Sequence, residues 1–345
     1  MQVKYKALAI VGLVTIITSG ISGWSSYSTN VGVIDSAKQK ELRATATLIQ
    51  NDISEQEAKA AARASLIVSL PSIQDAFRRG DREDLAKRLV PPLLIQRDKY
   101  GVREGHFHLA PATSFLRLYD LEAGHGEDLS SFREMVLATN RKGEPQKGVE
   151  IGRRGLSIRG VDVVRDAAGP IGSFEIGLSF TPVLESLKKN SGYDGAVFVD
   201  KVMMADIATS MPKPDNERIV GLYQNVEATN WKAIRPMVSA DLLNEAKDVA
   251  VRIKTVDGVD FGLVAVPLLD FKGKRIGAVV ALKSFEDYQS LQMAALVRAI
   301  GFALLQAIIL SGAMLILINV LFIHPQEALS KAAKDAKDAE EKKNA

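Results

Sequence analysis

Two long apolar segments without any charged side chain lie near the two ends of this chain of 345 residues. The first covers residues 7–27 and the second covers residues 300–323. A helix that crosses a membrane needs about 20 mostly apolar residues, because each residue adds about 1.5 Å along the helix axis. Each segment therefore predicts a membrane-spanning helix, and we place the two spans at residues 7–29 and 294–323.

The first apolar segment also has a feature of a secretory signal peptide, because the basic residues Lys4 and Lys6 precede it. No cleavage site of the A-x-A type follows it, and its apolar run is longer than a typical signal core. Trp24 and Tyr27 lie where aromatic side chains gather at a membrane interface. The pattern favours a retained anchor, and a cleaved signal is the alternative.

Basic residues in the short flanks predict how the chain is oriented. Two lysines precede the first span, and Lys331, Lys334 and Lys337 follow the second. Lys and Arg in short flanks mark the cytoplasmic side of a membrane. We therefore expect residues 1–6 and the charged tail 324–345 in the cytoplasm. The two spans would then contact the lipid of a bacterial inner membrane, with the large middle segment in the periplasm.

A long amphipathic pattern follows the first span and predicts one helix over residues 30–70, ending or kinking at Pro71. A second helical region comes next and is predicted to stop at Pro91 and Pro92. Apolar residues recur every three or four positions along the long helix, at Ile34, Ala37, Leu42, Ala46, Ile49 and Ile53.

The pattern changes from Gly105 onward to short β-like runs that are separated by turn signals. A helical insert lies among them at residues 128–140, and Asp128 has the side chain of a helix N-cap. The candidate strands are His106–Leu109, Phe115–Asp120, Leu156–Val164 and Ile171–Phe180.

A faint internal repeat relates residues 160–180 to residues 264–285. Each copy contains a strand, a turn with Asp and Gly, a strand that opens with Ile-Gly, and a closing Phe. The repeat predicts two copies of one small unit, with chance resemblance as the alternative. The predicted fold class is α+β, with a long N-terminal helix beside two tandem antiparallel-sheet domains. We place the membrane-distal domain at residues 71–188 and the membrane-proximal domain at residues 189–293.

The composition excludes several classes of function. The net charge is only +3 and the basic residues are spread along the chain, so nothing indicates a nucleic-acid partner. The absence of cysteine excludes disulfides, thiolate metal ligands and a cysteine nucleophile. No H-E-x-x-H or G-x-S-x-G motif occurs, so we expect no enzyme and no cofactor. Carboxylates are abundant, and hydrolysis by a pair of acids is the alternative that the sequence leaves open.

Two histidines, His106 and His108, lie on one face of a predicted strand, because residues two apart in a strand point the same way. Two imidazoles on one face can hold a metal ion if a third ligand completes the set. His125, Glu127 and Asp128 are the candidates for that ligand. Because the sequence defines no third ligand, we assign no metal and treat His106, His108 and Asp128 as ligand-binding candidates.

Arg117 and Tyr119 share a face in the next predicted strand. A guanidinium can hold a carboxylate or phosphate with two hydrogen bonds, and a tyrosine adds a hydroxyl and an apolar wall. The alternative is a structural pair between Arg117 and an acid such as Asp128 or Glu175. Glu150 and Arg159 are further candidates, for which either a ligand or a salt-bridge partner fits the pattern.

Three motifs resemble those of one family of double Cache sensory domains of bacterial chemoreceptors and sensor kinases. They are FHLAPATSFLR at Phe107–Arg117, GEDLSSFR at Gly126–Arg133 and EIGRRGLSIRG at Glu150–Gly160. The resemblance covers roughly residues 30–290 and the two flanking spans. It implies PAS-like sheets, a long helix beside both, and a ligand held mainly in the membrane-distal domain. Such receptors usually continue into a HAMP linker and an output domain, whereas this sequence has only a HAMP-like start in its tail.

These observations favour a membrane-anchored sensor module that binds a small anionic or zwitterionic solute. We expect it to act as a homodimer and to pass a helix displacement across the membrane to a separate kinase or methyl-accepting output protein. The other reading of the short tail is that the sequence is a fragment of a longer receptor. The alternative function is a membrane-anchored scaffold that captures a solute or an exported protein without signalling.

Overall fold

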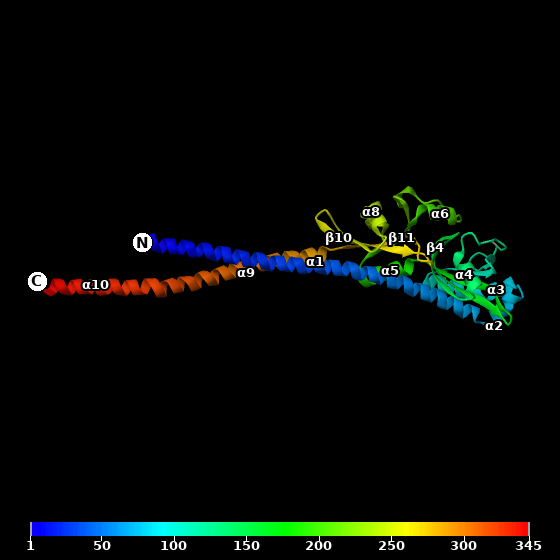
Figure 1. The fold of residues 1–345 in the computed structure, drawn as a ribbon, viewed down its shortest axis with the longest axis horizontal. Helices are drawn as coiled ribbons and strands as arrows, with labels where there is room; N and C mark the ends of the chain where they lie inside the picture. The colour runs from blue at the N-terminus through cyan, green and yellow to red at the C-terminus, as the bar shows by residue number, and fades with distance from the viewer. Residues whose placement is uncertain (1, 124, 344–345) are drawn as a thin grey trace. The chain divides into compact units, whose positions relative to one another are not determined.

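The structure is a computed structural model that describes residues 2–123 and 125–343. Contacts between residues group the chain into two compact units. One unit combines residues 1–38 with residues 286–345, and the other contains residues 39–285. Figure 1 shows the chain as a ribbon, with most of the helices and some of the strands labelled.

The first unit is formed by the two apolar helical regions that the sequence predicts. Helix α1 covers Gln2–Val68, α9 covers Glu286–Ile318, a π-helical turn covers Asn319–Ile323, and α10 covers His324–Lys343. The helical stretches Ala9–Val68 and Glu286–Ala336 are long and apolar enough to cross a membrane. Two apolar helices near the ends of the chain fit a two-pass membrane protein.

Small residues let the two helices of this unit approach each other closely. A Cβ atom on Gly23 of α1 would lie 2.9 Å from the Cβ of Ala303 and 3.3 Å from the carbonyl oxygen of Ala299. Thr15 and Ser19 of α1 are also buried. Contact through small residues is the common way in which membrane helices pack, because it brings the two backbones together.

The second unit begins with the remainder of α1 and two shorter helices. Helix α2 covers Pro71–Arg78, and α3 covers Arg82–Tyr100. The prediction that a helix stops at Pro91 and Pro92 is wrong, because α3 continues through both residues. Both prolines are exposed, so water can solvate the carbonyl groups that lose their hydrogen bonds. Leu85 and Leu89 keep the opposite side of α3 buried against the fold.

The first sheet has five antiparallel strands in the order β2-β1-β5-β4-β3. Helix α4, at Glu134–Lys142, follows the long loop after β2, and α5, at Thr181–Ser191, follows β5. The strands are β1 at Val102–Leu109, β2 at Thr113–Arg117, β3 at Gln146–Gly152, β4 at Gly155–Asp166 and β5 at Gly169–Leu178.

The second sheet has six antiparallel strands in the order β7-β8-β6-β11-β10-β9. Apart from the short β7, this order matches that of the first sheet strand for strand, with the β4–β5 hairpin corresponding to β10–β11. The repeated sequence pattern therefore does correspond to a repeated structure. The strands are β6 at Asp194–Asp200, β7 at Ile219–Val220, β8 at Tyr223–Ala228, β9 at Ala250–Val256, β10 at Val259–Leu269 and β11 at Arg275–Ser284.

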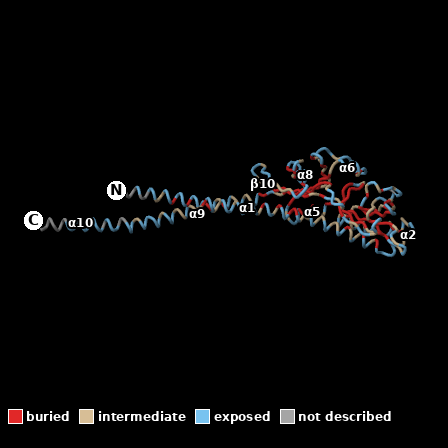
Figure 2. The backbone as a smooth tube through the Cα atoms, viewed as in Figure 1, coloured by how far each residue is buried: buried red, intermediate tan, exposed pale blue. Residues whose placement is uncertain are grey.

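Short helices join the strands of the second sheet and cover one of its faces. Most of its core is aliphatic and comes from the strands and these helices, and it includes Phe198, Leu242, Leu263 and Val280. Figure 2 shows that the buried residues gather in the two sheets. The connecting elements are α6 at Lys201–Ile207, a 3-10 turn at Asn216–Arg218, α7 at Trp231–Ile234 and α8 at Ala240–Glu245.

Helix α1 packs against both sheets through its residues after 38 (Figure 1). Its backbone meets Gly160 of β4, where a Cβ atom would lie only 2.1 Å from the backbone nitrogen of Ala61. An earlier part of α1 contacts the second sheet, where Glu41 accepts a hydrogen bond of 2.8 Å from Lys283 of β11. Glycine is required at residue 160 because any side chain would push the helix away from the sheet.

The tip of the β10–β11 hairpin in the second sheet reaches the first sheet. The backbone N–H of Phe271 donates a 3.1 Å hydrogen bond to the carbonyl of Val149 in β3. Lys272 forms an ion pair with Glu134 at the start of α4. Gly148 of β3 has a φ of 151°, and a Cβ there would lie 2.5 Å from the Cβ of Phe271. The hairpin tip therefore sits directly against β3 and α4.

Candidate functional site

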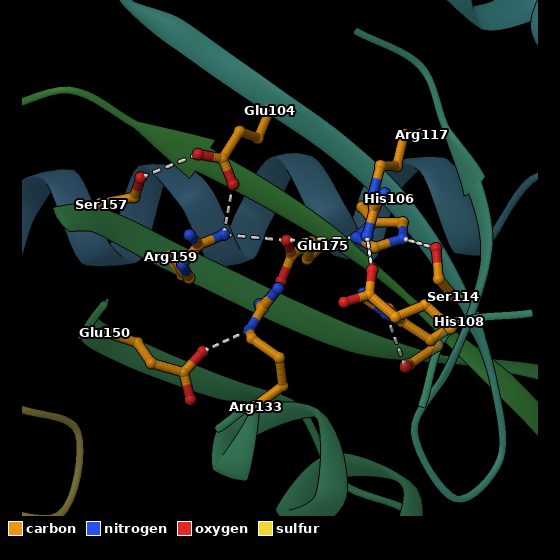
Figure 3. A network of polar contacts seen from close by, with 12 residues as sticks. Glu104, His106, His108, Ser114, Arg117, Arg133, Glu150, Ser157, Arg159 and Glu175 are labelled. Atoms are coloured by element: carbon orange, nitrogen blue, oxygen red, sulfur yellow. Dashed lines mark hydrogen bonds and ion pairs between the residues drawn. The ribbon is translucent and has the colours of Figure 1, made fainter. Parts of the chain in front are cut away.

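One face of the first sheet carries a buried group of polar and charged side chains from all five strands (Figure 3). Alternate residues of β1, β4 and β5 point to this face, whereas β2 contributes residues on both sides of an irregularity in its pairing with β1. Arg133 reaches the face from the segment before α4. The strand pairing places His106 opposite both Arg117 and Glu175. We call this group the buried polar network, and it consists of Glu104, His106, His108, Ser114, Arg117, Arg133, Glu150, Ser157, Arg159, Ser173 and Glu175.

Glu175 lies at the centre of the buried polar network and is fully buried. Its Oε1 accepts a 2.8 Å hydrogen bond from Arg159, and its Oε2 accepts one from Arg133. Burial by itself raises the pKa of Glu175, but the two guanidinium groups outweigh it and lower that pKa to about 2. Glu175 is therefore ionised at neutral pH, and both of its oxygens are engaged.

Arg133 joins Glu175 to the start of α4. Its Nε donates a 2.8 Å hydrogen bond to Glu150 Oε2, and Glu150 Oε1 accepts a 2.9 Å bond from the backbone N–H of Met135. Burial lowers the pKa of Arg133, but Glu175 and Glu150 reverse the effect and raise it. The carboxylate of Glu150 thus occupies the N-terminal end of α4, where a negative charge is favourable.

Arg159 links Glu175 to a second acid, Glu104. Its Nη1 donates a 2.6 Å hydrogen bond to Glu104 Oε2, and Ser157 donates one of 3.2 Å to Glu104 Oε1. Gly177 lies between the two strands that carry this pair, and a Cβ on it would lie 3.2 Å from the Cβ of Glu104. The missing side chain leaves the space in which the carboxylate and the guanidinium meet.

Each of the two histidines is held by a serine on a neighbouring strand. His106 Nε2 lies 2.8 Å from Ser114 Oγ, and His108 Nδ1 lies 3.3 Å from Ser173 Oγ. The two ring centroids are 4.2 Å apart. Burial lowers the pKa of His106 well below its usual value, and burial lowers the pKa of His108 to about 3. Both imidazoles are therefore neutral at physiological pH.

A cleft with a volume of about 740 Å³ opens beside the buried polar network. Arg117 and Tyr119 line it from one side, and Arg153 and Arg154 line it from the β3–β4 turn. Arg117 donates a 2.5 Å hydrogen bond to Glu127, and Arg154 stacks 4.7 Å from the centre of the Tyr119 ring. Burial raises the pKa of Tyr119 to about 12, with Glu104 and Glu175 acting in the same direction, so its hydroxyl keeps its proton.

The structure brings together most of the residues that the sequence singles out. His106, His108, Glu150 and Arg159 are all buried in the network. Arg117 joins the network and the cleft, but it pairs with Glu127 rather than with Asp128 or Glu175. Tyr119 lies beyond the end of β2, two residues after Arg117, and still lines the same cleft.

Asp128 is the one candidate that the structure leaves outside both the network and the lining of the cleft. It is exposed, and its Oδ1 accepts a 2.9 Å hydrogen bond from the backbone N–H of Ser130. The prediction that it caps the helical insert is wrong, because α4 begins only at Glu134. A turn over Leu129–Arg133 separates the two, and Glu150 supplies the acceptor at the start of α4 instead.

Three charged residues of the network were not predicted as site residues, namely Glu104, Arg133 and Glu175, and neither were its three serines. Arg133 lies at the end of the motif GEDLSSFR, and Glu175 interrupts the apolar strand SFEIGLSF. A charge inside an otherwise apolar strand is a signal for a buried pair, because an unpaired charge is rarely buried. Glu104 carries the same signal, two residues before His106 in β1.

Residues 36–289 match the sequence profile of the dCache_3 family, which is described as the double sensory domain of two-component sensor kinase. The chain belongs to this family. The two sheets with matching strand order fall within the matched residues, so they form the double sensory domain. No curated protein matches this sequence.

The solved structures to which this chain is similar share little sequence with it. The ligand-binding domain of the Campylobacter jejuni chemoreceptor Tlp3, in complex with L-valine, is 11% identical with a TM-score of 0.43. The alignment covers 78% of this chain and 98% of that chain. The sensor domain of the V. cholerae histidine kinase DctB is 11% identical with a TM-score of 0.41, and 74% of this chain and 98% of that chain are covered.

Proposed function

We propose that this chain is a membrane-anchored sensor whose double sensory domain binds a small anionic or zwitterionic solute. The observation that carries the proposal is the cleft of about 740 Å³ that borders the buried polar network. Its volume lies within the range of small-molecule sites, and charged and aromatic groups converge on it.

The charges of the cleft favour a ligand with a carboxylate or a similar anionic group. Three guanidinium groups, from Arg117, Arg153 and Arg154, face two carboxylates, from Asp120 and Glu127. Glu127 already accepts hydrogen bonds from Arg117 and from Arg153, at 2.5 and 3.4 Å. A solute carboxylate can take over these donors with two-point geometry, which makes arginine the preferred partner for such anions.

The cleft also joins the two halves of the double sensory domain. Thr209 and Ser210 follow α6 and line it together with the β3–β4 turn. The backbone N–H of Ser210 donates a 3.0 Å hydrogen bond to the carbonyl of Arg153. A bound solute would therefore contact residues from both halves and favour one packing of the two sheets over another.

The β10–β11 hairpin offers a route from the first sheet to α9. Its tip touches β3 and α4 through Phe271 and Lys272, and its second strand ends at Ser284, two residues before α9 begins. Displacements of an ångström or two are typical of switching helices, and the coupling free energy is typically about 1–3 kcal/mol. We infer that α9 carries such a shift through the inner membrane, with the double sensory domain on the periplasmic side.

The signalling assembly that follows from this proposal is a homodimer whose spans pack together in the lipid. A separate kinase or methyl-accepting protein would read the movement of α9 and α10. The chain itself would act by binding alone, without catalysis. These steps rest on the apolar helices at the ends of the chain and on the sensory family to which it belongs.

The solute-binding step is tested with the full chain in lipid nanodiscs. A metabolite library is screened by thermal melting, since a solute at a hundred times its Kd stabilises by about 2.7 kcal/mol. Arg117→Ala should weaken binding of any hit at least tenfold while the melting temperature without solute stays nearly the same. The matched control is Arg141→Ala, on an exposed arginine of α4 outside the cleft. Equal binding by both variants would contradict the assignment of the cleft.

The transmission step is tested with Phe271→Ala. The chain has no cysteine, so Asn190→Cys and Asp287→Cys can carry a unique pair of spin labels. Solute should shift the distance between the labels by an ångström or two in the otherwise unchanged chain. Phe271→Ala should keep solute binding and lose the shift. If solute binds but never moves α9, the chain is a capturing scaffold and not a sensor.

A further inference from the structure

Three potential metal ligands converge inside the buried polar network. One nitrogen of His106, one nitrogen of His108 and one carboxylate oxygen of Glu175 all lie within 4.8 Å of one another. His106 Nδ1 is 3.9 Å from Glu175 Oε1, which is too long for a hydrogen bond. The sequence supplied the two histidines but no third ligand, and the fold supplies Glu175 in place of His125, Glu127 or Asp128.

Each of the two imidazoles has one ring nitrogen next to a serine hydroxyl. Ser114 engages Nε2 of His106, and Ser173 engages Nδ1 of His108, so each ring has one nitrogen left over. Nε2 of His108 is buried and has no hydrogen-bond partner among the described residues. In metal sites the second nitrogen of each histidine is commonly fixed by a hydrogen bond while the first binds the ion.

The charge of the network leaves room for a cation. The carboxylates of Glu104, Glu150 and Glu175 carry three formal negative charges, and the guanidinium groups of Arg133 and Arg159 carry two positive ones. The charge of Arg117, the third arginine of the network, is balanced by its ion pair with Glu127. The two arginines repel an ion at Glu175, and the surplus carboxylate offsets that repulsion.

We propose that His106, His108 and Glu175 bind a divalent transition-metal ion such as Zn²⁺. Imidazole nitrogen and carboxylate oxygen suit Zn²⁺ and its neighbours in the first transition row. Two ligands about 2.0–2.1 Å from a tetrahedral Zn²⁺ lie roughly 3.4 Å apart. Closing the 3.9 Å pair of His106 and Glu175 therefore needs a movement of about half an ångström.

The cleft gives the ion a way in. Arg117 and Tyr119 line the cleft, and His106 is the direct cross-strand neighbour of Arg117. The ring of Tyr119 lies 6.4 Å from the ring of His106. A rotation of these two side chains opens the site to the solvent of the cleft. The metal site does not depend on the proposed solute, because its three ligands lie in the network behind the cleft.

The first test measures Zn²⁺ binding to the full chain in nanodiscs, purified without a histidine tag and stripped by a chelator. Titration calorimetry should show one saturable Zn²⁺ per chain. His106→Gln and His108→Gln should each weaken binding at least tenfold, and the matched control His125→Gln, on an exposed histidine of the neighbouring loop, should not change it. An absence of saturable binding, or an equal loss in His125→Gln, would overturn the proposal.

A second measurement holds even if the histidine variants fold poorly. Co²⁺ added to the unaltered chain should give d–d absorption bands stronger than those of the aqueous ion. Ser114→Ala keeps all three ligands and should weaken Zn²⁺ binding about 10- to 100-fold, as loss of an orienting partner does. A spectrum identical to aqueous Co²⁺ would overturn the site. So would stabilisation by methylammonium but not by Zn²⁺, since that outcome identifies an ammonium site.

Discussion

Glu175 and Val280 occupy the same position in two sheets that share a strand order. Glu175 of β5 pairs with His106 of β1, and Val280 of β11 pairs with Ala196 of β6. Neither Glu175 nor Val280 is exposed to solvent. One backbone arrangement therefore buries an ion-paired carboxylate in the first sheet and an aliphatic side chain in the second.

The contrast continues across the rest of this face. The strand pairing makes His108 equivalent to Phe198, and Arg159 equivalent to Leu263. A buried apolar side chain contributes about 1.5–3 kcal/mol through the hydrophobic effect. A buried ion pair contributes little net stability, because desolvation of the charges offsets their attraction. The comparison teaches that the second sheet is built for stability, whereas the first sheet holds polar groups that stability alone does not require.

The largest difference should appear when one atom is changed at the two equivalent positions. Glu175→Gln removes the charge that Arg133 and Arg159 share, and should lower the free energy of unfolding by about 3–5 kcal/mol. Val280→Thr buries an unpaired hydroxyl and should lower it by about 1–3 kcal/mol. Urea unfolding measures the change in the free energy of unfolding for each variant. Hydrogen exchange of the backbone amides then shows whether the loss of stability lies in β5 or in β11. If Glu175→Gln lost less stability than Val280→Thr, the ion pairs of the network would contribute little to the stability of the first sheet.

A double-mutant cycle measures how strongly Arg159 and Glu104 are coupled in the first sheet, at a position where the second sheet has Leu263 in place of the arginine. Arg159→Leu installs the residue type of Leu263 but leaves Glu104 buried without its arginine. Adding Glu104→Leu removes that unpaired charge, so the double variant should lose less stability than the sum of the two single variants. The coupling should be about 0.5–3 kcal/mol, measured by urea unfolding in the presence of a chelator. Additive losses would show that Arg159 and Glu104 do not act as a pair.

Acid should weaken the first sheet more gently, and the second sheet hardly at all. His108 has a folded pKa of about 3, while an unfolded histidine has one of about 6.5. Above pH 6.5 the imidazole of His108 is neutral in both the folded and the unfolded chain. Between pH 6.5 and pH 3 it binds a proton in the unfolded chain only. Stability is therefore lost as the pH falls, by about 1.4 kcal/mol at pH 5.5.

In metal-free protein, the opening free energy that hydrogen exchange measures for the backbone amides of β1 should follow this pH dependence. The opening free energy measured for β6 should not. The matched variant is His108→Phe, which places the residue type of Phe198 in β1 and should remove this contribution. If the acid-induced loss were equal in both sheets, protonation of the histidine would not be its cause.

Local patterns in the sequence were enough to predict the helices at both ends and the two related sheets. The repeated hairpin was visible because glycine, acidic turn residues and a closing phenylalanine recur at the same spacing in both copies. The end of α3 was predicted wrongly, because proline removes a hydrogen bond locally while the packing of Leu85 and Leu89 carries the helix onward. Tertiary packing outweighed the local signal there.

The buried network was predictable only in part. His106, Arg117 and Arg159 stand out as polar residues in β-like runs, and Glu150 stands out in the glycine-rich stretch before one of these runs. A sequence does not, however, give the register between strands. Arg133 and Glu175 are 42 positions apart along the chain and meet only because β5 lies at the centre of the sheet. Whether the singled-out residues bind solute stays a prediction for the Arg117 experiment.

The direct backbone contact between Gly160 of β4 and helix α1 makes it easier for the helix to slide in one direction along the sheet than in the other. The two alanines of α1 that now cover the glycine are followed one turn later by Ala64 and Ser65, whereas Gln56 and Glu57 precede them by one turn. A slip of four residues, roughly 6 Å, toward the N-terminus of α1 would seat small side chains over the strand. A slip in the opposite direction would push the side chains of Gln56 and Glu57 against Gly160, where there is no room even for a methyl group. The contact therefore blocks sliding of α1 in one direction and permits it in the other.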